Sequence, residues 1–241
     1  MAYSAIIVTP IGAQADPYVY AITDEEGSII EEMHDHGLGN VVTATSIFFN
    51  MLPNGANSAK QIIQSLSIKL EFYVTDSRVV LRCEKYDKGS SWSGGLAALA
   101  LDAASSIAAA ARRKGKVMLG HIRYEWIRAI SYSQGQIIIT YIDTERNNWT
   151  LSLLFKRATD TEFIAHEILR RTCAYRLAMT DERDEKDEEF YKKYASGGKI
   201  PPSDNPKKSI PRIQIPVSYL APGGKKFRPE WGTPKKEESN A

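Results

Sequence analysis

Cysteine, histidine and long apolar runs are all scarce in this chain of 241 residues. The two cysteines, Cys83 and Cys173, lie far apart without metal-ligand or redox spacing, so we interpret both as buried free thiols, which suits a reducing cytosol. No stretch reaches the roughly 18 uncharged apolar residues that a membrane-spanning helix needs, and Asp102 interrupts the best candidate. The N-terminus has no basic segment, and Pro10 and Gly12 break its apolar run, which argues against a secretory signal. These absences predict a cytoplasmic chain without a disulfide framework.

Signatures of catalysis and of nucleotide binding are also missing. The chain contains no phosphate loop, dinucleotide-binding fingerprint or nucleophile elbow. Among the four histidines, only His34 and His36 cluster with acidic residues, and Glu32 and Asp35 complete a candidate metal site there. The spacing matches no standard metal signature and glycines follow it, so an exposed polar loop is the favoured interpretation. We therefore predict no catalytic residue, no metal and no cofactor.

Apolar alternation is the main structural signal that the chain does carry. Hydrophobic residues make up 43% of the sequence, which is enough to bury a core, and the length favours one domain with extensions. Residues 67–75 and 79–86 alternate apolar and polar side chains around a turn at Asp76-Ser77, which predicts a hairpin. The same pattern predicts a meander of further strands at residues 117–126, 127–132, 136–142 and 149–155.

A long amphipathic helix is predicted directly after these strands. Thr159 and Glu162 have the spacing of a capping box, and Asp160 suits the positive end of a helix. A wide apolar stripe follows, made of Phe163, Ile164, Ile168, Leu169, Cys173, Tyr175, Leu177 and Met179. We expect this stripe to pack on the sheet and the arginines at 170, 171 and 176 to face water.

This order of elements resembles the pleckstrin-homology-like group, including its GRAM branch. The resemblance spans residues 66–179 and is carried by LEFYVTDSRVVLRC at 70–83, GHIRYEWIRAISYS at 120–133, GQIIITYID at 135–143 and NWTLSLLF at 148–155. It implies an α+β fold, in which an antiparallel sheet or partly open barrel is closed by a C-terminal helix, with an alanine-rich helix inserted. Members of this group mostly bind lipid headgroups or other proteins, so the resemblance implies a binding module without catalysis.

Composition divides the chain into an N-terminal extension at residues 1–65 packed with the main domain, the domain at 66–180 with its insertion at 92–116, a charged helical extension at 181–195, and a tail at 196–241. The charged segment is expected to continue the preceding helix into solvent or to fray.

The N-terminal extension carries weaker signals. Strands are predicted at 5–9, 18–23 and 28–33, the last two as a hairpin, and they either begin the sheet or pair beside it. Residues 41–52 are open between helix and strand. Asn57 is the predicted cap of a short helix at 58–66.

The inserted segment at residues 92–116 departs from the family pattern. Its helical spacing places Leu96, Leu99, Ala103 and Ile107 on one face, and Arg112, Arg113, Lys114 and Lys116 gather at its C-terminal end. Three interpretations stay open. The helix packs closely on the sheet or on a second copy through its small residues, it lies on an anionic membrane with the basic residues on headgroups, or the segment is a disordered loop.

The tail combines basic charge with proline. From residue 196 it has nine basic and four acidic residues, giving +5, so the rest of the chain carries −3 of the total +2. Eight of the eleven prolines also lie there, and such a composition predicts an extended or disordered arm. The arm either only keeps the chain in solution, without a partner, or makes contacts through two apolar stretches, 213–217 and 227–231. These stretches could add a strand to a sheet edge or place an aromatic residue, Phe227 or Trp231, in a pocket.

Two functions follow from these features. The first is peripheral association with anionic lipid through Arg112, Arg113, Lys114 and Lys116. The alternative is a protein-interaction or self-assembly module that uses the alanine-rich helix and the tail. Nucleic acid is not an expected partner, because the body of the chain is mildly acidic and its aromatic residues are not interleaved with basic ones.

Overall fold

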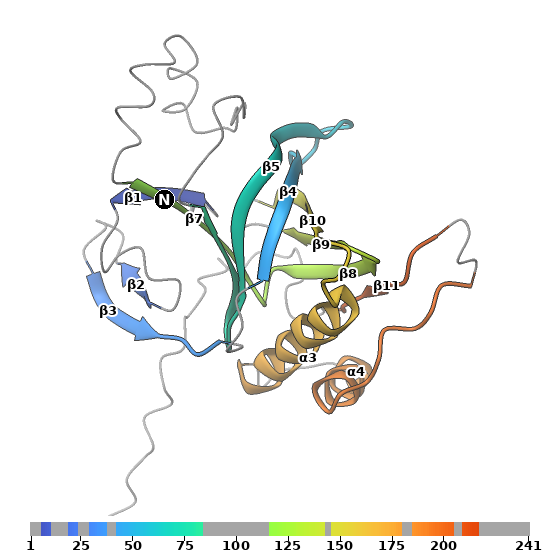
Figure 1. The fold of residues 1–241 in the computed structure, drawn as a ribbon. Helices are drawn as coiled ribbons and strands as arrows, with labels where there is room; N and C mark the ends of the chain where they lie inside the picture. The colour runs from blue at the N-terminus through green and yellow to red at the C-terminus, as the bar shows by residue number, and fades with distance from the viewer. Residues whose placement is uncertain are drawn as a thin grey trace, which may run out of the picture.

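The computed structural model describes residues 6–10, 19–23, 29–37, 42–83, 116–142, 146–179, 185–204 and 209–216. Nine strands form one open antiparallel sheet, and a separate hairpin pairs β2 (Val19–Thr23) with β3 (Ile29–His34). One helix lies against the large sheet and a second helix packs on the first (Figure 1). The strand order in the large sheet is β1 (Ile6–Pro10), β7 (Lys116–Arg123), β6 (Arg78–Cys83), β5 (Lys60–Val74), β4 (Val42–Leu52), β10 (Asn148–Phe155), β9 (Gln136–Ile142), β8 (Ile127–Ser133) and β11 (Arg212–Gln214). This confirms the α+β class and the antiparallel sheet.

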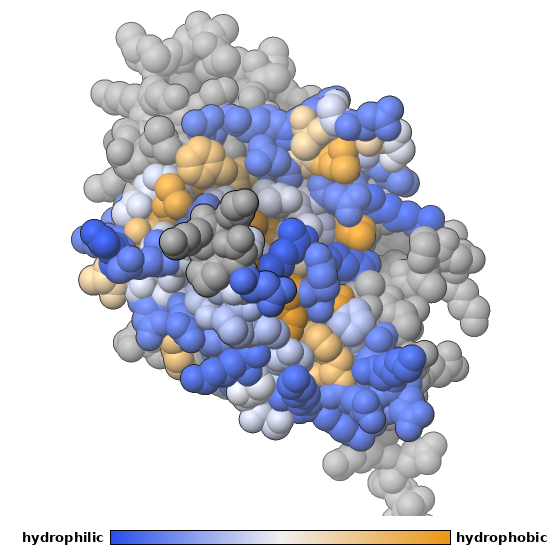
Figure 2. Space-filling view, turned by 90° about the vertical axis from the view of Figure 1, so that its right-hand side faces the viewer, coloured by the Kyte–Doolittle hydropathy of each residue, from blue (hydrophilic) through white to orange (hydrophobic). Residues whose placement is uncertain are grey.

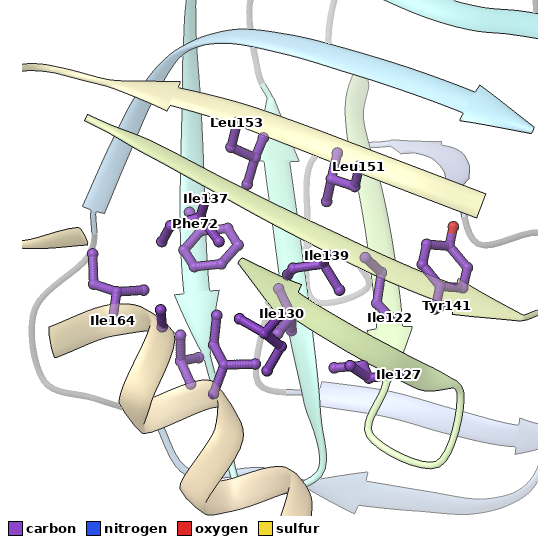
Figure 3. Close-up of a cluster of buried hydrophobic side chains, with 14 of the residues drawn as sticks. Phe72, Ile122, Ile127, Ile130, Ile137, Ile139, Tyr141, Leu151, Leu153 and Ile164 are labelled. Atoms are coloured by element: carbon purple, nitrogen blue, oxygen red, sulfur yellow. The ribbon is translucent and has the colours of Figure 1, made fainter. Parts of the chain in front are cut away.

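Period-two alternation decides which face of the sheet holds the core. Along β9, partly exposed and buried residues alternate without a break, and Ile137, Ile139 and Tyr141 are fully buried. Their neighbours Leu151 and Leu153 on β10 enter the same cluster. Figure 3 shows these side chains gathered on one side of the strands. The core therefore lies on one apolar face of the sheet.

Helix α3 (Thr161–Met179) covers that face, as predicted. Ile164, Ile168 and Leu169 are buried in the main core, whereas Phe163 is 56% exposed and lies outside it. The predicted capping box is wrong by one residue. The helix begins after Asp160, whose Oδ1 accepts a hydrogen bond from the backbone N–H of Phe163 at 2.9 Å.

The charged segment after α3 forms a second helix, α4 (Glu185–Ala195), instead of a solvated extension. It packs against α3 (Figure 1). Tyr191 and Tyr194 are three residues apart and therefore lie on one face, where both are buried. The dense charge of this segment occupies the other positions, which explains why the sequence pattern resembles a solvated helix.

The large sheet begins well before residue 66. β4 lies at its centre, between β5 and β10. The helix predicted at 58–66 is wrong, because β5 runs from Lys60 and pairs with β4 from Met51↔Lys60 onwards. Gly55, at φ +77°, allows the turn at the tip of this hairpin. β1 joins the far edge beside β7, while β2 and β3 pair beside the sheet.

The tail is partly ordered on the sheet. The composition predicts an extended or disordered arm from residue 196, but residues 212–214 form β11, and Ile200, Ile213 and Ile215 are buried in the main core. Apolar residues in alternate positions give this short segment one face to bury despite its prolines. Residues 217–241, with Phe227 and Trp231, lie outside the described residues.

Candidate functional site

Most of the predicted contact residues lie outside the described residues. This applies to Leu96, Leu99, Ala103, Ile107, Arg112, Arg113 and Lys114, as well as to Phe227 and Trp231. Lys116 is the first residue of β7 and pairs in register with Pro10 of β1. The lipid hypothesis and the helix-packing hypothesis for this segment therefore remain predictions.

Asp35 from the candidate metal cluster has a structural role. Its carboxylate accepts hydrogen bonds from the Thr75 hydroxyl at 2.5 Å, the Ser77 hydroxyl at 2.8 Å and the Asp76 backbone N–H at 3.2 Å. Arg78 adds an ion pair at 3.5 Å. Within the part of the chain that the structure describes, no group of three or more histidine, cysteine, aspartate or glutamate residues could hold a metal. Asp35 instead joins the end of β3 to the β5–β6 turn.

The edge of β8 carries the arrangement with the most chemical definition. β11 pairs antiparallel with it, with Ile213 opposite Ile130. The Tyr132 N–H donates to the Pro211 carbonyl at 3.2 Å, and the Ile215 N–H donates to the Arg128 carbonyl at 2.8 Å. The backbone edge of β8 is thus satisfied by the tail of the same chain.

Alternate side chains of the tail segment have opposite environments. Ile213 and Ile215 are 6% and 3% exposed and belong to the main core, whereas Arg212 and Gln214 are exposed. Of the stretch 213–217, which the sequence offers as a candidate contact, Ile213 and Gln214 belong to a strand on an edge of the chain's own sheet. Burying two isoleucine side chains contributes about 3–6 kcal/mol by area.

Arg176 fixes the end of this segment. Its guanidinium donates to the Pro216 carbonyl at 2.8 Å and to the carbonyls of Tyr124 and Glu125 at 3.1 and 3.2 Å, as well as to that of Ile127. The prediction that this arginine faces water is wrong, because its side chain is fully buried. One planar cation with several N–H donors can satisfy turn and tail carbonyls together, which explains its burial.

Tyr191 of α4 reaches the same carbonyl as Arg176. Its hydroxyl donates to the Pro216 oxygen at 2.6 Å, and the Arg176 guanidinium lies 5.7 Å from the centre of its ring. Burial raises the pKa of Tyr191, against the opposing effect of the neighbouring guanidinium, so the hydroxyl keeps its proton as a donor. We call the β8 edge from Arg128 to Tyr132, with Arg176 and Tyr191, the tail site.

His166 holds the chain on its way to the tail site. Its Nε2 accepts a hydrogen bond from the Ile200 N–H at 2.9 Å, and its ring meets the Tyr132 ring edge to face at 5.6 Å. Burial lowers the pKa of His166, which favours the neutral imidazole that this bond requires. Helix α3 therefore positions both ends of the returning chain, His166 near its start and Arg176 at its end.

A second polar cluster joins α3 to the β5–β6 turn. Arg171 donates to Glu167 at 2.7 Å and to Asp76, and Arg170 adds two bonds to Glu167. Burial alone would raise the pKa of Glu167, but the bonds from the two arginines lower it overall. The prediction that Arg171 faces water is wrong, because its side chain is mostly buried between Glu167 and Asp76. This cluster orients the helix above the sheet and therefore supports the tail site indirectly.

The two cysteines behave as predicted and are buried free thiols. Burial raises the pKa of Cys173 to about 12, so this thiol stays protonated near neutral pH and is a poor nucleophile.

Comparison of the chain with protein-family models, with curated proteins and with solved structures finds no match. Neither α3 nor α4, the helices of the described residues, is long and apolar enough to cross a membrane. The fold and the tail site therefore carry the functional argument.

The sequence predicts an extended or disordered arm and offers residues 213–217 as a candidate contact, but it does not predict the groups that hold this segment. Ile213 and Ile215 were visible because apolar residues alternate there inside a polar tail. Arg176, Tyr191 and His166 carry no such signal, since arginine, tyrosine and histidine on an amphipathic helix ordinarily lie at its solvent boundary. Their role depends on partners that lie 25 to 52 residues away in the chain.

Proposed function

We propose that this chain is a non-enzymatic protein-interaction module with a pleckstrin-homology-like fold, and that its tail site binds an extended segment by adding it as a strand to β8. The observation that carries this proposal is that β11, a segment of the tail, already pairs with β8 as an added strand. Backbone bonds supply binding along the edge, and the burial of Ile213 and Ile215 supplies selectivity.

The arrangement of the sheet supports the family assignment. Seven consecutive strands, β4 to β10, are antiparallel, and the helix that follows them packs across their apolar face. An antiparallel sheet closed by a C-terminal helix is what the resemblance implies. Strand addition needs a rigid sheet edge, and this edge is backed by α3 through Arg176.

The proposal is tested with a labelled peptide of residues 209–217, SIPRIQIPV, added to the full chain. In the wild-type chain its own tail competes at an effective concentration on the order of millimolar, so little peptide binds. The double change Ile213→Asp, Ile215→Asp displaces the competing tail, because a bound tail would have to bury two carboxylates in the core. We expect the peptide to bind this variant at least about tenfold more tightly than it binds the wild type, measured by fluorescence anisotropy.

A matched control changes the two exposed positions of the same strand. The chain with Arg212→Ala and Gln214→Ala should keep its tail seated and should bind peptide as weakly as the wild type does. Equal peptide binding by the wild type and the aspartate variant, with circular dichroism showing that both are folded, would contradict the proposal.

Salt dependence separates strand addition from the lipid hypothesis. Association of Arg112, Arg113, Lys114 and Lys116 with anionic vesicles would weaken steeply as salt rises, and it would be lost when all four are changed to alanine. Peptide binding to β8 rests on backbone bonds and apolar burial, so it should change little with salt and persist in that fourfold variant.

A further inference from the structure

The arm between α4 and β11 leaves the body of the molecule before it returns to β8 (Figure 1). After Ile200, which is buried, Pro201, Pro202 and Asp204 are exposed, and on the returning side Ser209 and Ile210 are exposed too. The hydroxyls of Ser203 and Ser209 are hydrogen-bonded to each other, so the outgoing and returning legs lie side by side. The segment that connects α4 to β11 is thus an exposed arm and is not part of the packed core.

Proline makes the arm a stiff connection. Four of its residues are proline, at positions 201, 202, 206 and 211, and each has a fixed φ near −65°. Proline-rich segments favour extended conformations that act as semi-rigid spacers. Fully extended, residues 201–211 would span about 35 Å, which is about twice the radius of gyration of roughly 18 Å expected for a folded chain of this length.

The tail site recognises a combination of features that this sequence contains. It takes an isoleucine opposite Ile130, a second isoleucine two residues later, and a carbonyl that receives both Arg176 and Tyr191. A second copy of the chain carries all of these in the right order. A tail that leaves its own β8 can therefore form the same hydrogen bonds and bury the same isoleucines on the β8 of another copy.

The visible surface on this side shows no single large apolar patch among the described residues. Figure 2 shows the face that carries the arm, with hydrophobic residues in small separate groups among hydrophilic ones. Ile210 is one of two large hydrophobic residues that are exposed among those the structure describes, and it lies in the arm itself. Because Ile210 lies in the arm, an exchange of arms would carry this exposed side chain to the second copy.

From these features we infer that the tail strand is exchanged between two copies of the chain, so that β11 of each completes the β8 edge of the other in a closed twofold dimer. This inference rests on the proposed function, because it needs a tail site that accepts a strand from outside. It names the partner as a second copy. In the dimer, β8 of each copy is paired with β11 of the other, so the exchange ends at two copies and does not build a filament.

Engineered cysteines at one cross-strand pair test the exchange. Arg212 lies opposite Ser131 in a non-hydrogen-bonded pair, between two hydrogen-bonded pairs. The Cα atoms of a non-hydrogen-bonded pair are about 4.5 Å apart, which is within the range for a disulfide. Full chains with Ser131→Cys are mixed with full chains with Arg212→Cys over a series of protein concentrations under mild oxidation. Exchange predicts a covalent heterodimer on a non-reducing gel, in an amount that rises with concentration.

Gln214→Cys supplies the matched control, because it lies on the same exposed side of β11 but opposite Ala129. The mixture with Arg212→Cys should form at least about tenfold more heterodimer than the mixture with Gln214→Cys. A single chain with both Ser131→Cys and Arg212→Cys verifies the register, since it can close the bond internally. Internal closure in that chain, with heterodimer no more abundant than in the control mixture, would overturn the exchange. The peptide experiment would then still decide the proposed function separately.

Discussion

Arg176 is a fully buried arginine on α3 that joins the sheet to the tail. A buried guanidinium is costly to desolvate, and it is tolerated only where its N–H groups have partners. Here the carbonyls of Tyr124, Glu125, Ile127 and Pro216 provide them. The same residue therefore fixes the β7–β8 turn and the end of the tail strand.

Replacing Arg176 tests this role. Arg176→Met keeps most of the side-chain volume but leaves buried carbonyls without a donor, so we expect the free energy of unfolding to fall by about 3–5 kcal/mol. Arg170→Met on the same helix is the control, because the Arg170 side chain is 42% exposed and its ion pair contributes about 1 kcal/mol or less. Urea denaturation of both variants gives the comparison. Similar losses for the two would contradict the role of Arg176.

His166 makes attachment of the tail depend on pH. Because burial lowers the pKa of His166 below its ordinary value near 6.5, the unfolded chain binds a proton more readily than the folded one. The bond to the Ile200 N–H is therefore present above about pH 6.5 and is lost as the pH falls through the folded-state pKa. Glu162 and Asp160 raise the pKa of His166 and Lys199 lowers it, while Tyr132 faces the ring.

Amide exchange at Ile200 measures this dependence. We expect hydrogen exchange at Ile200, corrected for its intrinsic pH dependence, to lose protection in the wild type as the pH is lowered below about 6.5. His166→Gln keeps an acceptor that does not titrate, and its protection should stay level over this range. The same loss in both proteins would assign the pH effect to another group.

At the scale of elements, the β8–β9 hairpin depends on one glycine. Gly135 has φ +77°, and a Cβ there would meet the Phe155 carbonyl oxygen at 3.3 Å. Gly55 in the β4–β5 turn has the same φ with open space around it. Both Gly→Ala changes cost about 1–2 kcal/mol through backbone strain, and Gly135→Ala should cost more because of the added contact. Thermal unfolding of the two variants tests this order, and an equal cost would show that the neighbouring strand yields freely.

Helices and strands in which apolar residues recur at a regular spacing could be predicted from the sequence. Those that depend on pairing with a distant strand could not. The strands near residues 67–155 and the helix after Asp160 follow from alternation, turn residues and an apolar stripe. Residues 58–66 looked helical because Asn57 resembles a cap, yet pairing with β4 makes them strand from Lys60 onwards. The position of β4 at the sheet centre likewise depends on its pairing with β10, about 100 residues later in the sequence. In the tail site, only the isoleucines had a local signal.

On the scale of the whole molecule, β1 and β11 are the outermost strands of the open sheet, and each covers a longer strand that would otherwise be the edge. β1 pairs with β7 at one edge and β11 with β8 at the other. Long unpaired edge strands bind other strands readily, so the short strands β1 and β11 protect the backbone of β7 and β8 while they stay in place. The short β11 and its exposed arm make the β8 edge the one from which a segment can be displaced.

The most direct test of the tail site is hydrogen exchange at the Tyr132 amide, which donates to the Pro211 carbonyl. We predict slow exchange in the wild type, fast exchange in the chain with Ile213→Asp and Ile215→Asp, and renewed protection when the peptide of residues 209–217 is added to that variant. The Ile139 amide, inside the sheet, should stay protected throughout. If Tyr132 exchanges at one rate in all three samples, the β8 edge does not bind the tail strand as proposed.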